Sequence, residues 1–393
     1  MNRSFAVAVV GTGFLARTRV RCWRRVHHAR VEIVVVSRDR ANAEQFAQSC
    51  GANRAATFDE VLADDKVLLI DLCVPNHAHA PLCARAAKAK KHVLCTKPLT
   101  AYWGQGLPAE ATSAEVAATP REKMLEVALA DAERMVAACR EHGVQLFYGE
   151  NWCFAPSIVR AAALGAAGNG VALEMRGWES HSGSHAAYAR EWRNAGGGAL
   201  LRLGAHPIGA MLWLKRREGL QRRGAPTKVV AVTAEVADLS RVAAGAACEV
   251  ATGWHEVENW GVCTLHFDDG SRGVAYGSDN MLGGMQSHLT ILGSDHRFEC
   301  ALSPNDMLRA YAVHEGAFGA EYLMEKVHGQ AGWSTPMPDE DWTSGQQGMV
   351  QSVAEHLVEG GTSDVDGQLG LEVVRVIYSA YRSAVEGRRV AIG

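Results

Sequence analysis

Val7-Ala8-Val9-Val10-Gly11-Thr12-Gly13-Phe14-Leu15-Ala16, near the start of the 393-residue chain, is the segment most informative about the fold. The apolar run predicts a buried strand, and the G-x-G-x-x-A pattern after it predicts a tight turn into a helix. The first glycine permits the turn, the second lets the backbone approach a pyrophosphate, and the small alanine lets helix and strand pack closely. Because a helix N-terminus favours negative charge, we expect a dinucleotide-binding turn formed by Gly11, Thr12, Gly13, Phe14, Leu15 and Ala16.

The segments that follow alternate between short apolar runs and amphipathic stretches. We predict strands at residues 5–10, 31–36, 67–74, 92–95 and 145–148, and helices at residues 14–26, 41–50, 79–89 and 124–142. Strands that alternate with helices of this length form parallel βαβ units, and continuous apolar strands suit a sheet covered on both faces. Residues 1–148 are therefore predicted to form a Rossmann dinucleotide-binding domain.

The pattern changes after Gly149. We predict strands at residues 171–178, 228–239, 259–267, 273–278 and 287–292, and helices at residues 156–166, 206–215, 348–358 and 369–385. Residues 268–271 read Asp-Asp-Gly-Ser, a hairpin turn signal between two of these strands. Residues 149–393 are therefore predicted to form a C-terminal α/β domain with a largely antiparallel open sheet, which makes the chain an α/β protein.

One segment interrupts the first domain. Residues 101–122 contain Gly104, Gly106, Pro108 and Pro120 among small residues, which predicts a surface excursion. Because it is longer than most connections, a lid, an oligomer contact and a plain loop all remain open.

Composition excludes several classes of protein. The net charge is −3, so no overall field attracts nucleic acid or an anionic membrane, and no run approaches the ~20 apolar residues of a membrane span. The apolar run at residues 5–10 is too short for the core of a signal peptide. Ten scattered cysteines without a CxxC pair predict reduced thiols, a cytoplasmic protein and no cysteine-based metal site.

The second strand ends at Ser37-Arg38, where NAD-selective proteins often carry a carboxylate. Ser37 and Arg38 could instead hold the 2′-phosphate of NADP. Arg38 could also stack on adenine or be an ordinary surface residue, so the sequence predicts NAD or NADP with a tilt towards NADP.

Three further motifs complete a family pattern. They are Cys73-Val74-Pro75-Asn76-His77-Ala78-His79, Lys91 to Leu99 with Thr96-Lys97-Pro98, and the glycine-rich stretch from Gly196 to Pro207 with His206. With the Gly11–Ala16 turn, the hairpin at 267–273 and the segment 381–388, the chain resembles the Gfo/Idh/MocA oxidoreductases, the relatives of glucose–fructose oxidoreductase and inositol dehydrogenase.

The resemblance implies a nicotinamide-dependent enzyme that oxidises or reduces a hydroxyl of a sugar or polyol. It implies that Lys97 and His206 are catalytic, and that the open sheet forms a homodimer or homotetramer. The further cofactor contacts that we expect from it are Val74, Pro75, Asn76, His79, Thr96 and Lys97.

The physical logic agrees with these roles. Alcohol oxidation needs a base near the hydroxyl with a pKa close to the working pH. His206 titrates near neutrality, whereas the pKa of Lys97 would have to be lowered by burial and by a neighbouring positive charge. We therefore expect His206 to be the base and Lys97 the orienting donor, although the roles could be reversed.

Two positions depart from the family pattern. Thr96 replaces the glutamate usual before the lysine, and Arg202 replaces the aspartate usual four residues before the histidine. Because guanidinium pairs well with anions, we hypothesise an acidic sugar as substrate. The alternative is that Arg202 pairs with a protein carboxylate such as Glu179.

Polar residues near Arg202 in the sequence complete the expected substrate site. We expect substrate contacts from Asn151, Trp152, Arg176, Glu179, His181, His185, Arg202 and His206. Glu179, His181 and His185 are also a sensible metal trio, but their spacing does not place all three on one face of a helix or strand, so we expect no metal.

Three functions remain open at this point. The first is a sugar dehydrogenase. The second, known among members of the resembled family, is an NAD-dependent glycosidase that uses transient C3 oxidation and elimination on an anionic glycoside such as a sulfoquinovoside. The third is a nucleotide-sensing regulator without chemistry, which would not need both Lys97 and His206. Neither nucleic acid nor a membrane is an expected partner.

Overall fold

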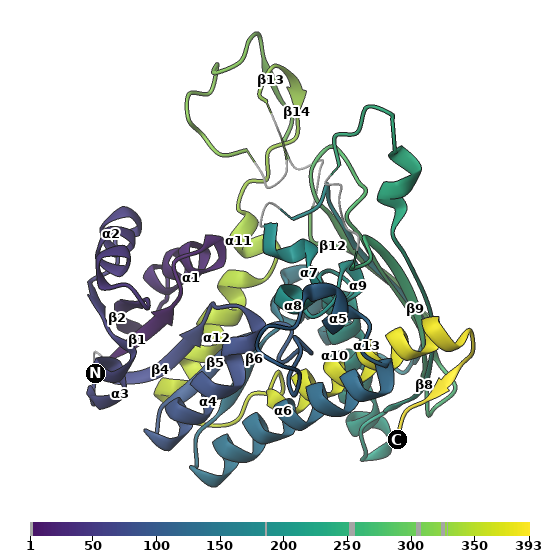
Figure 1. The fold of residues 1–393 in the computed structure, drawn as a ribbon, viewed down its shortest axis with the longest axis horizontal. Helices are drawn as coiled ribbons and strands as arrows, with labels where there is room; N and C mark the ends of the chain where they lie inside the picture. The colour runs from purple at the N-terminus through teal and green to yellow at the C-terminus, as the bar shows by residue number, and fades with distance from the viewer. Residues whose placement is uncertain (1–2, 185–186, 251–255, 304–307, 324–326, 328) are drawn as a thin grey trace.

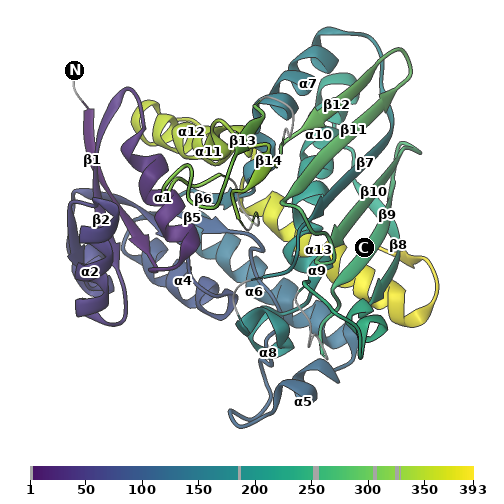
Figure 2. The same ribbon diagram turned by 90° about the horizontal axis from the view of Figure 1, so that it is seen from above.

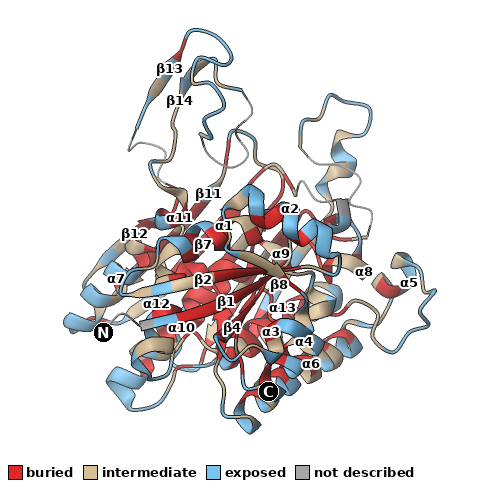
Figure 3. Ribbon diagram, turned by 90° about the vertical axis from the view of Figure 1, so that its left-hand side faces the viewer, coloured by how far each residue is buried: buried red, intermediate tan, exposed pale blue. Residues whose placement is uncertain are grey.

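The computed structural model describes residues 3–184, 187–250, 256–303, 308–323, 327 and 329–393. Two sheets lie on either side of a central group of helices (Figure 1). Figure 3 shows that buried residues concentrate in the strands of the first sheet and in the helix faces that pack against it. The α/β fold class is confirmed.

The first sheet is a six-stranded parallel sheet in the order β3-β2-β1-β4-β5-β6. Its strands are β1 (Arg3–Val10), β2 (Ala29–Val36), β3 (Arg54–Ala56), β4 (Val67–Leu72), β5 (His92–Thr96) and β6 (Leu146–Gly149). The connecting helices are α1 (Phe14–Arg24), α2 (Arg40–Cys50), α3 (Phe58–Ala63), α4 (His79–Lys88) and α6 (Arg121–Glu141). The predicted parallel Rossmann sheet is confirmed, and only the short β3 and α3 were missed.

Successive residues of β1 point to opposite faces of the sheet, as a strand requires. Val7 and Val9 pack in the same apolar cluster as α1 and α2, whereas Ala6 and Ala8 pack in the cluster that contains residues of α3, α4 and α6. The first of these clusters also includes Met349 and Val353 of α12 (Gln346–Glu359). A segment more than 300 residues away in the sequence thus covers the first sheet, while the boundary at residue 148 stays a prediction.

The second sheet has seven strands in the order β12-β11-β7-β10-β9-β8-β15. They are β7 (Ala172–Ser180), β8 (Val229–Ala237), β9 (Trp260–Phe267), β10 (Arg272–Ser278), β11 (Gln286–Gly293), β12 (Arg297–Ala301) and β15 (Val390–Ala391). Only the β7–β10 pair is parallel, so the largely antiparallel sheet is confirmed.

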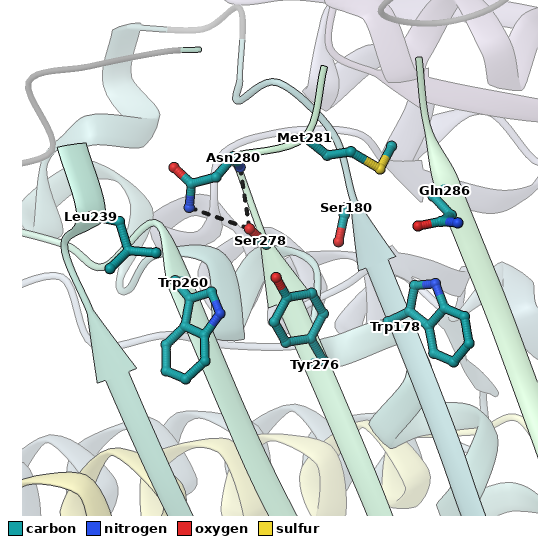
Figure 4. A pocket seen from close by; sticks show the side chains of 9 residues that line it. All are labelled: Trp178, Ser180, Leu239, Trp260, Tyr276, Ser278, Asn280, Met281 and Gln286. Atoms are coloured by element: carbon teal, nitrogen blue, oxygen red, sulfur yellow. Dashed lines mark hydrogen bonds between the residues drawn. The ribbon is translucent and has the colours of Figure 1, made fainter. Parts of the chain in front are cut away.

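One face of this sheet packs on helices. α7 (Pro156–Ala167), α10 (Ala205–Arg223) and α13 (Gly367–Glu386) lie on the side towards the first sheet (Figure 2). Gly177 of β7 allows this close packing, because a Cβ there would lie 2.6 Å from Pro207. The other face is open and carries Trp178, Trp260 and Tyr276 around a hollow of about 570 Å³ (Figure 4).

The predicted surface excursion at 101–122 is more embedded than its composition indicates. It contains the short helix α5 (Ser113–Ala117), and Tyr102 and Val116 are buried. The backbone N–H of Tyr102 donates to the hydroxyl of Tyr378 in α13 at 2.6 Å. Two apolar side chains anchor a segment that otherwise reads as loop, so its path follows the body of the protein.

Smaller elements connect the main layers. They are α8 (Trp192–Ala195), α9 (Ala199–Arg202), α11 (Glu340–Thr343), β13 (Ala310–Ala312), β14 (Gly332–Ser334) and the 3-10 helices Asn76–Ala78, Asn151–Phe154, Ala187–Arg190 and Leu239–Ala243. β13 and β14 form a small antiparallel sheet that projects from the body (Figure 1). Within the described part of the chain, no helix combines the length and apolar character needed to cross a membrane.

Candidate functional site

The turn between β1 and α1 is built for an anion. Gly11 has φ +124°, and a Cβ there would lie 2.3 Å from the carbonyl oxygen of Cys73, so only glycine fits. Gly13 caps α1 without any side-chain hydrogen bond, and a Cβ there would meet nothing within 4 Å. The space beside Gly13, at the positive end of α1, is therefore open, which fits a pyrophosphate.

The other residues of this turn have different surroundings. Ala16 is fully buried against the sheet, as the motif predicts, and Leu15 is half-buried. Thr12 accepts a hydrogen bond from Asn42 at 3.2 Å. Phe14 is 62% exposed at the start of α1, so this ring offers an apolar surface beside the turn.

The parallel strands bring several loops to the same edge, because all their carboxyl ends point one way. Val74, Pro75 and Asn76 follow β4, and Thr96 and Lys97 lie at the end of β5. Asn76 donates through Nδ2 to the carbonyl of Ala195 at 2.8 Å, which ties this edge to the second domain.

His79 supports this edge from inside. Its ring is completely buried, with Nδ1 3.1 Å from the carbonyl of Leu99 and Nε2 2.9 Å from the carbonyl of Val74. Both ring nitrogens thus hold the loops after β4 and β5, and the cofactor contact of His79 stays a prediction.

The end of β2 carries Ser37 and Arg38 as predicted. Asp39, the nearest carboxylate in the sequence, accepts a hydrogen bond from the N–H of Ala41 and caps α2. Arg40 pairs with Glu44 and Glu60. Burial, and then the charge of Arg38, lower the pKa of His77, so Arg38 lies near the loop after β4.

Lys97 reaches from the end of β5 to the second domain. Its ammonium donates a hydrogen bond to the backbone carbonyl of Arg202 in α9. The peptide bond between Lys97 and Pro98 is cis. A direct polar contact thus joins the two motifs that carry the predicted catalytic lysine and histidine.

His206 lies in the first turn of α10 between two carboxylates. Its Nδ1 is 2.6 Å from Oε1 of Glu150, and its Nε2 is 3.8 Å from Oε1 of Glu179. Trp152 stacks on the imidazole, with 5.9 Å between ring centroids and 13° between planes. The imidazole is therefore held from three sides.

Burial controls the protonation of this group. It lowers the pKa of His206 and raises the pKa of Glu150 to about 8, because a charge on either side chain loses its hydration. The positive charge of Lys97 opposes the shift of Glu150 and adds to that of His206. One shared proton is the favoured state of the pair near neutral pH.

Arg202 forms an ion pair with Asp279, which follows β10. One guanidinium nitrogen contacts Oδ2 and the other lies 3.4 Å from Oδ1. Asp279 is fully buried, and its Oδ1 is also 3.6 Å from Nδ1 of His181. The expectation that Arg202 pairs with a protein carboxylate is met by Asp279.

Three of the predicted substrate residues need comment. Arg176 points to the open face of the second sheet and pairs with Glu174, so it is not in this site. The reason is strand alternation: Arg176 and Glu179 are an odd number of residues apart and lie on opposite faces of β7. Asn151 is buried and donates to the carbonyl of Ser344 at 2.6 Å. His185 lies outside the described residues.

The structure therefore brings together most of the predicted site residues and adds two. Lys97, Trp152, Glu179, His181, Arg202 and His206 are joined by contacts that also include Glu150 and Asp279, which sequence reasoning missed. A carboxylate directly after the buried strand 146–149 was a usable signal for Glu150. No cluster of three or more metal-type ligands occurs among the described residues.

Comparison with known proteins settles the family. A family model described as an oxidoreductase family with an NAD-binding Rossmann fold matches residues 5–128, and the Gfo/Idh/MocA C-terminal domain matches residues 158–299. Together the two matches span more than half of the chain. The chain belongs to the Gfo/Idh/MocA oxidoreductase family. The resemblance is thus confirmed, and the first sheet is the NAD-binding Rossmann fold of this family.

Curated relatives match over part of their length. The chain is 30% identical to inositol 2-dehydrogenase of Corynebacterium glutamicum over 102 residues, which cover 25% of this chain and 30% of the relative. It is 26% identical to D-apiose dehydrogenase of Paraburkholderia graminis over 157 residues, 40% of this chain and 35% of the relative. An uncharacterized oxidoreductase of Rhizobium meliloti is 41% identical over 68 residues, 17% of this chain and 20% of the relative.

One solved structure matches this Gfo/Idh/MocA protein over its whole length. GenD2 from gentamicin A biosynthesis, determined in complex with NAD, is 27% identical with a TM-score of 0.79, covering 100% of this chain and 97% of GenD2. Scyllo-inositol dehydrogenase of Lactobacillus casei, with NAD(H) and scyllo-inositol, has a TM-score of 0.71 at 14% identity and covers 99% of each chain. The second likeness establishes the fold alone.

Proposed function

We propose that this member of the family is a nicotinamide-dependent dehydrogenase that acts on a secondary hydroxyl of a sugar or polyol. The observation that carries the proposal is the buried His206, held by Glu150 and Trp152 close to Lys97 at the edge where the dinucleotide turn lies. The names of the relatives, which include an inositol and an apiose dehydrogenase, support the same substrate class.

The chain's own residues divide the work as follows. The open N-terminus of α1 holds the pyrophosphate of the dinucleotide, whose nicotinamide, when bound, accepts hydride from the substrate carbon. Lys97 donates a hydrogen bond to the reacting oxygen and stabilises the negative charge that develops there. His206 takes the hydroxyl proton at Nε2, the nitrogen that does not face Glu150.

Neutral sugars and polyols are the first substrates to test. The charge of Arg202 is matched by Asp279, so the acidic-sugar hypothesis has less support than the sequence alone gave it. It remains testable with the same panel of compounds.

The test is initial-rate oxidation of inositols, aldoses, uronates and aryl glycosides with NAD and with NADP, followed by absorbance of the reduced nicotinamide and by aglycone release. We expect net reduced cofactor with a free sugar or polyol, and a loss of about 100-fold or more in kcat for Lys97→Met and His206→Asn. Aglycone release without net reduction would point to a glycosidase instead. NAD binding by both variants, measured by calorimetry, separates lost chemistry from lost cofactor.

We also propose a homodimer or homotetramer formed through the open face of the second sheet. Trp178, Trp260 and Tyr276 lie side by side on this face on neighbouring strands (Figure 4), which is typical of a surface covered by a partner. Light scattering would measure the mass in solution. All ten cysteines are free thiols and seven are buried, which suits a reducing compartment such as the cytoplasm.

A further inference from the structure

Glu150 is placed in a way that its position in the sequence does not explain. It follows β6 directly, has no exposed surface, and lies 2.6 Å through Oε1 from Nδ1 of His206. The same oxygen accepts a hydrogen bond from the N–H of Trp152 at 3.1 Å. Its second oxygen, Oε2, is buried without a hydrogen-bond partner among the described residues. A fully ionised carboxylate would be costly in this position.

Neighbouring groups pack closely around Glu150 and His206. A Cβ on Gly209, one turn along α10 from His206, would lie 2.9 Å from Cγ of Glu150, so the helix passes directly over this side chain. Tyr148 and Cys153 interact electrostatically with the same carboxyl group. Glu150 therefore has little freedom to turn away from the imidazole.

We propose that Glu150 is a positioning residue that shares one proton with His206, so that the pair, and not the imidazole alone, accepts the proton of the substrate hydroxyl. The inference rests on the proposed dehydrogenase function and adds a proton-holding partner to it. Its basis is the short contact of the fully buried Glu150 with Nδ1 of His206, whose side chain is 9% exposed; Nε2, which does not face Glu150, is then the nitrogen that takes the substrate proton.

The proton can be followed atom by atom. In the receptive state Glu150 is a carboxylate, Nδ1–H of His206 donates to it, and Nε2 carries a lone pair. When the C–H bond breaks and hydride leaves to the nicotinamide, the hydroxyl proton passes to Nε2. The proton on Nδ1 can then move to Oε1 of Glu150, so the pair ends with a carboxylic acid and a neutral imidazole. No buried imidazolium has to persist, which removes a charge that burial opposes.

The charged groups that face the pair are Lys97 from the end of β5 and Glu179 from β7. Lys97 favours the carboxylate of Glu150, whereas burial favours the carboxylic acid and dominates, so the pKa of Glu150 is raised to about 8. Glu179 favours a protonated His206. The pair therefore titrates as a unit near the pH at which alcohol oxidation needs its base.

The experiment compares the wild type with Glu150→Gln, which keeps an oxygen for Nδ1–H but cannot hold the proton. For the wild type we expect kcat/KM for oxidation to rise with pH to a plateau, with a midpoint near the pKa of about 8. In Glu150→Gln we expect kcat/KM to stay constant between about pH 6 and 9. Its value should be at least about tenfold below the wild-type plateau. Glu174→Gln, on the open face of β7, is the matched control and should keep the wild-type profile. An unchanged midpoint in Glu150→Gln would overturn the proposal.

A second readout needs no substrate. Long-range ¹H–¹⁵N NMR of the holoprotein, with His206 assigned through His206→Asn, reports whether Nε2 carries a proton. We expect Nε2 of the wild type to lose its proton through the pKa of about 8, and this change to be absent from Glu150→Gln. If Nε2 of wild-type His206 shows no such change, the proton-sharing pair is rejected even if the enzyme is a dehydrogenase. Conversely, the NMR result can hold while the substrate panel fails, which would reject the proposed function alone.

Discussion

Arg202 uses its side chain and its backbone for two different contacts: the guanidinium pairs with both carboxylate oxygens of Asp279, and the carbonyl accepts a hydrogen bond from Lys97. The ion pair is largely enclosed, with 15% of the Arg202 side chain and none of the Asp279 side chain exposed. The residue that departs from the family pattern is therefore charge-matched within the chain. Through its backbone it also positions the ammonium of Lys97.

Removing one partner of this enclosed ion pair should destabilise the protein more than removing both. We expect Arg202→Met to lower the free energy of unfolding by about 3 kcal/mol, because it leaves the carboxylate of Asp279 buried without its main partner. The double variant Arg202→Met with Asp279→Asn should recover a large part of this loss. Urea denaturation monitored by tryptophan fluorescence measures both, and equal losses in the single and double variants would show that the buried carboxylate of Asp279 is not the cause of the loss.

Substituting Gly11 or Gly13 of the dinucleotide turn by alanine should have different effects, one on stability and the other on cofactor binding. In Gly11→Ala the new Cβ meets the carbonyl of Cys73 at 2.3 Å on a backbone with φ +124°, so we expect a loss of stability of about 1–3 kcal/mol. In Gly13→Ala the Cβ meets no protein atom, so the fold should keep its stability, but the methyl group stands where the pyrophosphate approaches. Thermal unfolding and calorimetric titration with NAD separate the two effects. A Gly13→Ala variant with wild-type affinity would argue against the pyrophosphate site.

Arg38 should decide how well NADP competes with NAD. Arg38 stands at the end of β2, where NAD-selective proteins often carry a carboxylate, and Asp39 next to it is held by the N–H of Ala41 as the cap of α2, so we expect NADP to be accepted alongside NAD. Arg38→Ala should lower kcat/KM for NADP about tenfold more than for NAD. Arg40→Ala, which removes an arginine paired with Glu44 and Glu60, is the control. Equal losses with both coenzymes would indicate that Arg38 stacks on adenine.

The pair of Glu150 and His206 should also make stability depend on pH. Folding raises the pKa of Glu150 from 4.5 to about 8 and lowers the pKa of His206 from 6.5 to about 3. Between about pH 6.5 and 8 the folded pair keeps a proton that the unfolded chain releases, so the free energy of unfolding falls as the pH rises. Below about pH 4.5 the unfolded chain binds two protons and the folded pair one, so stability falls again as the pH falls.

Glu150→Gln should change this profile in a defined way. The loss of stability between about pH 6.5 and 8 should disappear, because no folded carboxyl group holds a proton there. A loss should begin below about pH 6.5, because unfolded His206 binds a proton that the buried imidazole does not. Differential scanning calorimetry across this range measures both slopes, with Glu174→Gln as the reference variant. Parallel wild-type and Glu150→Gln profiles would contradict the assignment.

Local patterns in the sequence were enough to predict most elements of both sheets. The strand at 5–10, the turn at Gly11 and the helix after it follow from residues that are neighbours in the chain, and so do the hairpin at 268–271 and the long helices 124–142 and 369–385. Each of these features depends on periodicity or turn chemistry within about a dozen residues. Lys97 and His206 were expected to be catalytic only because their motifs resemble those of the family.

Which side chains meet in the site depends on the tertiary structure. Glu150 and His206 are 56 positions apart, Arg202 and Asp279 are 77, and both pairs depend on which strand ends and helix starts the two domains place together. Arg176 is the instructive exception, since strand alternation in the sequence already separated it from Glu179. Local physics thus accounts for the helices, the strands and the dinucleotide turn, and the family resemblance added Lys97 and His206 as the expected catalytic side chains. The partners that set their charge came from contacts between distant segments, which no local pattern encodes.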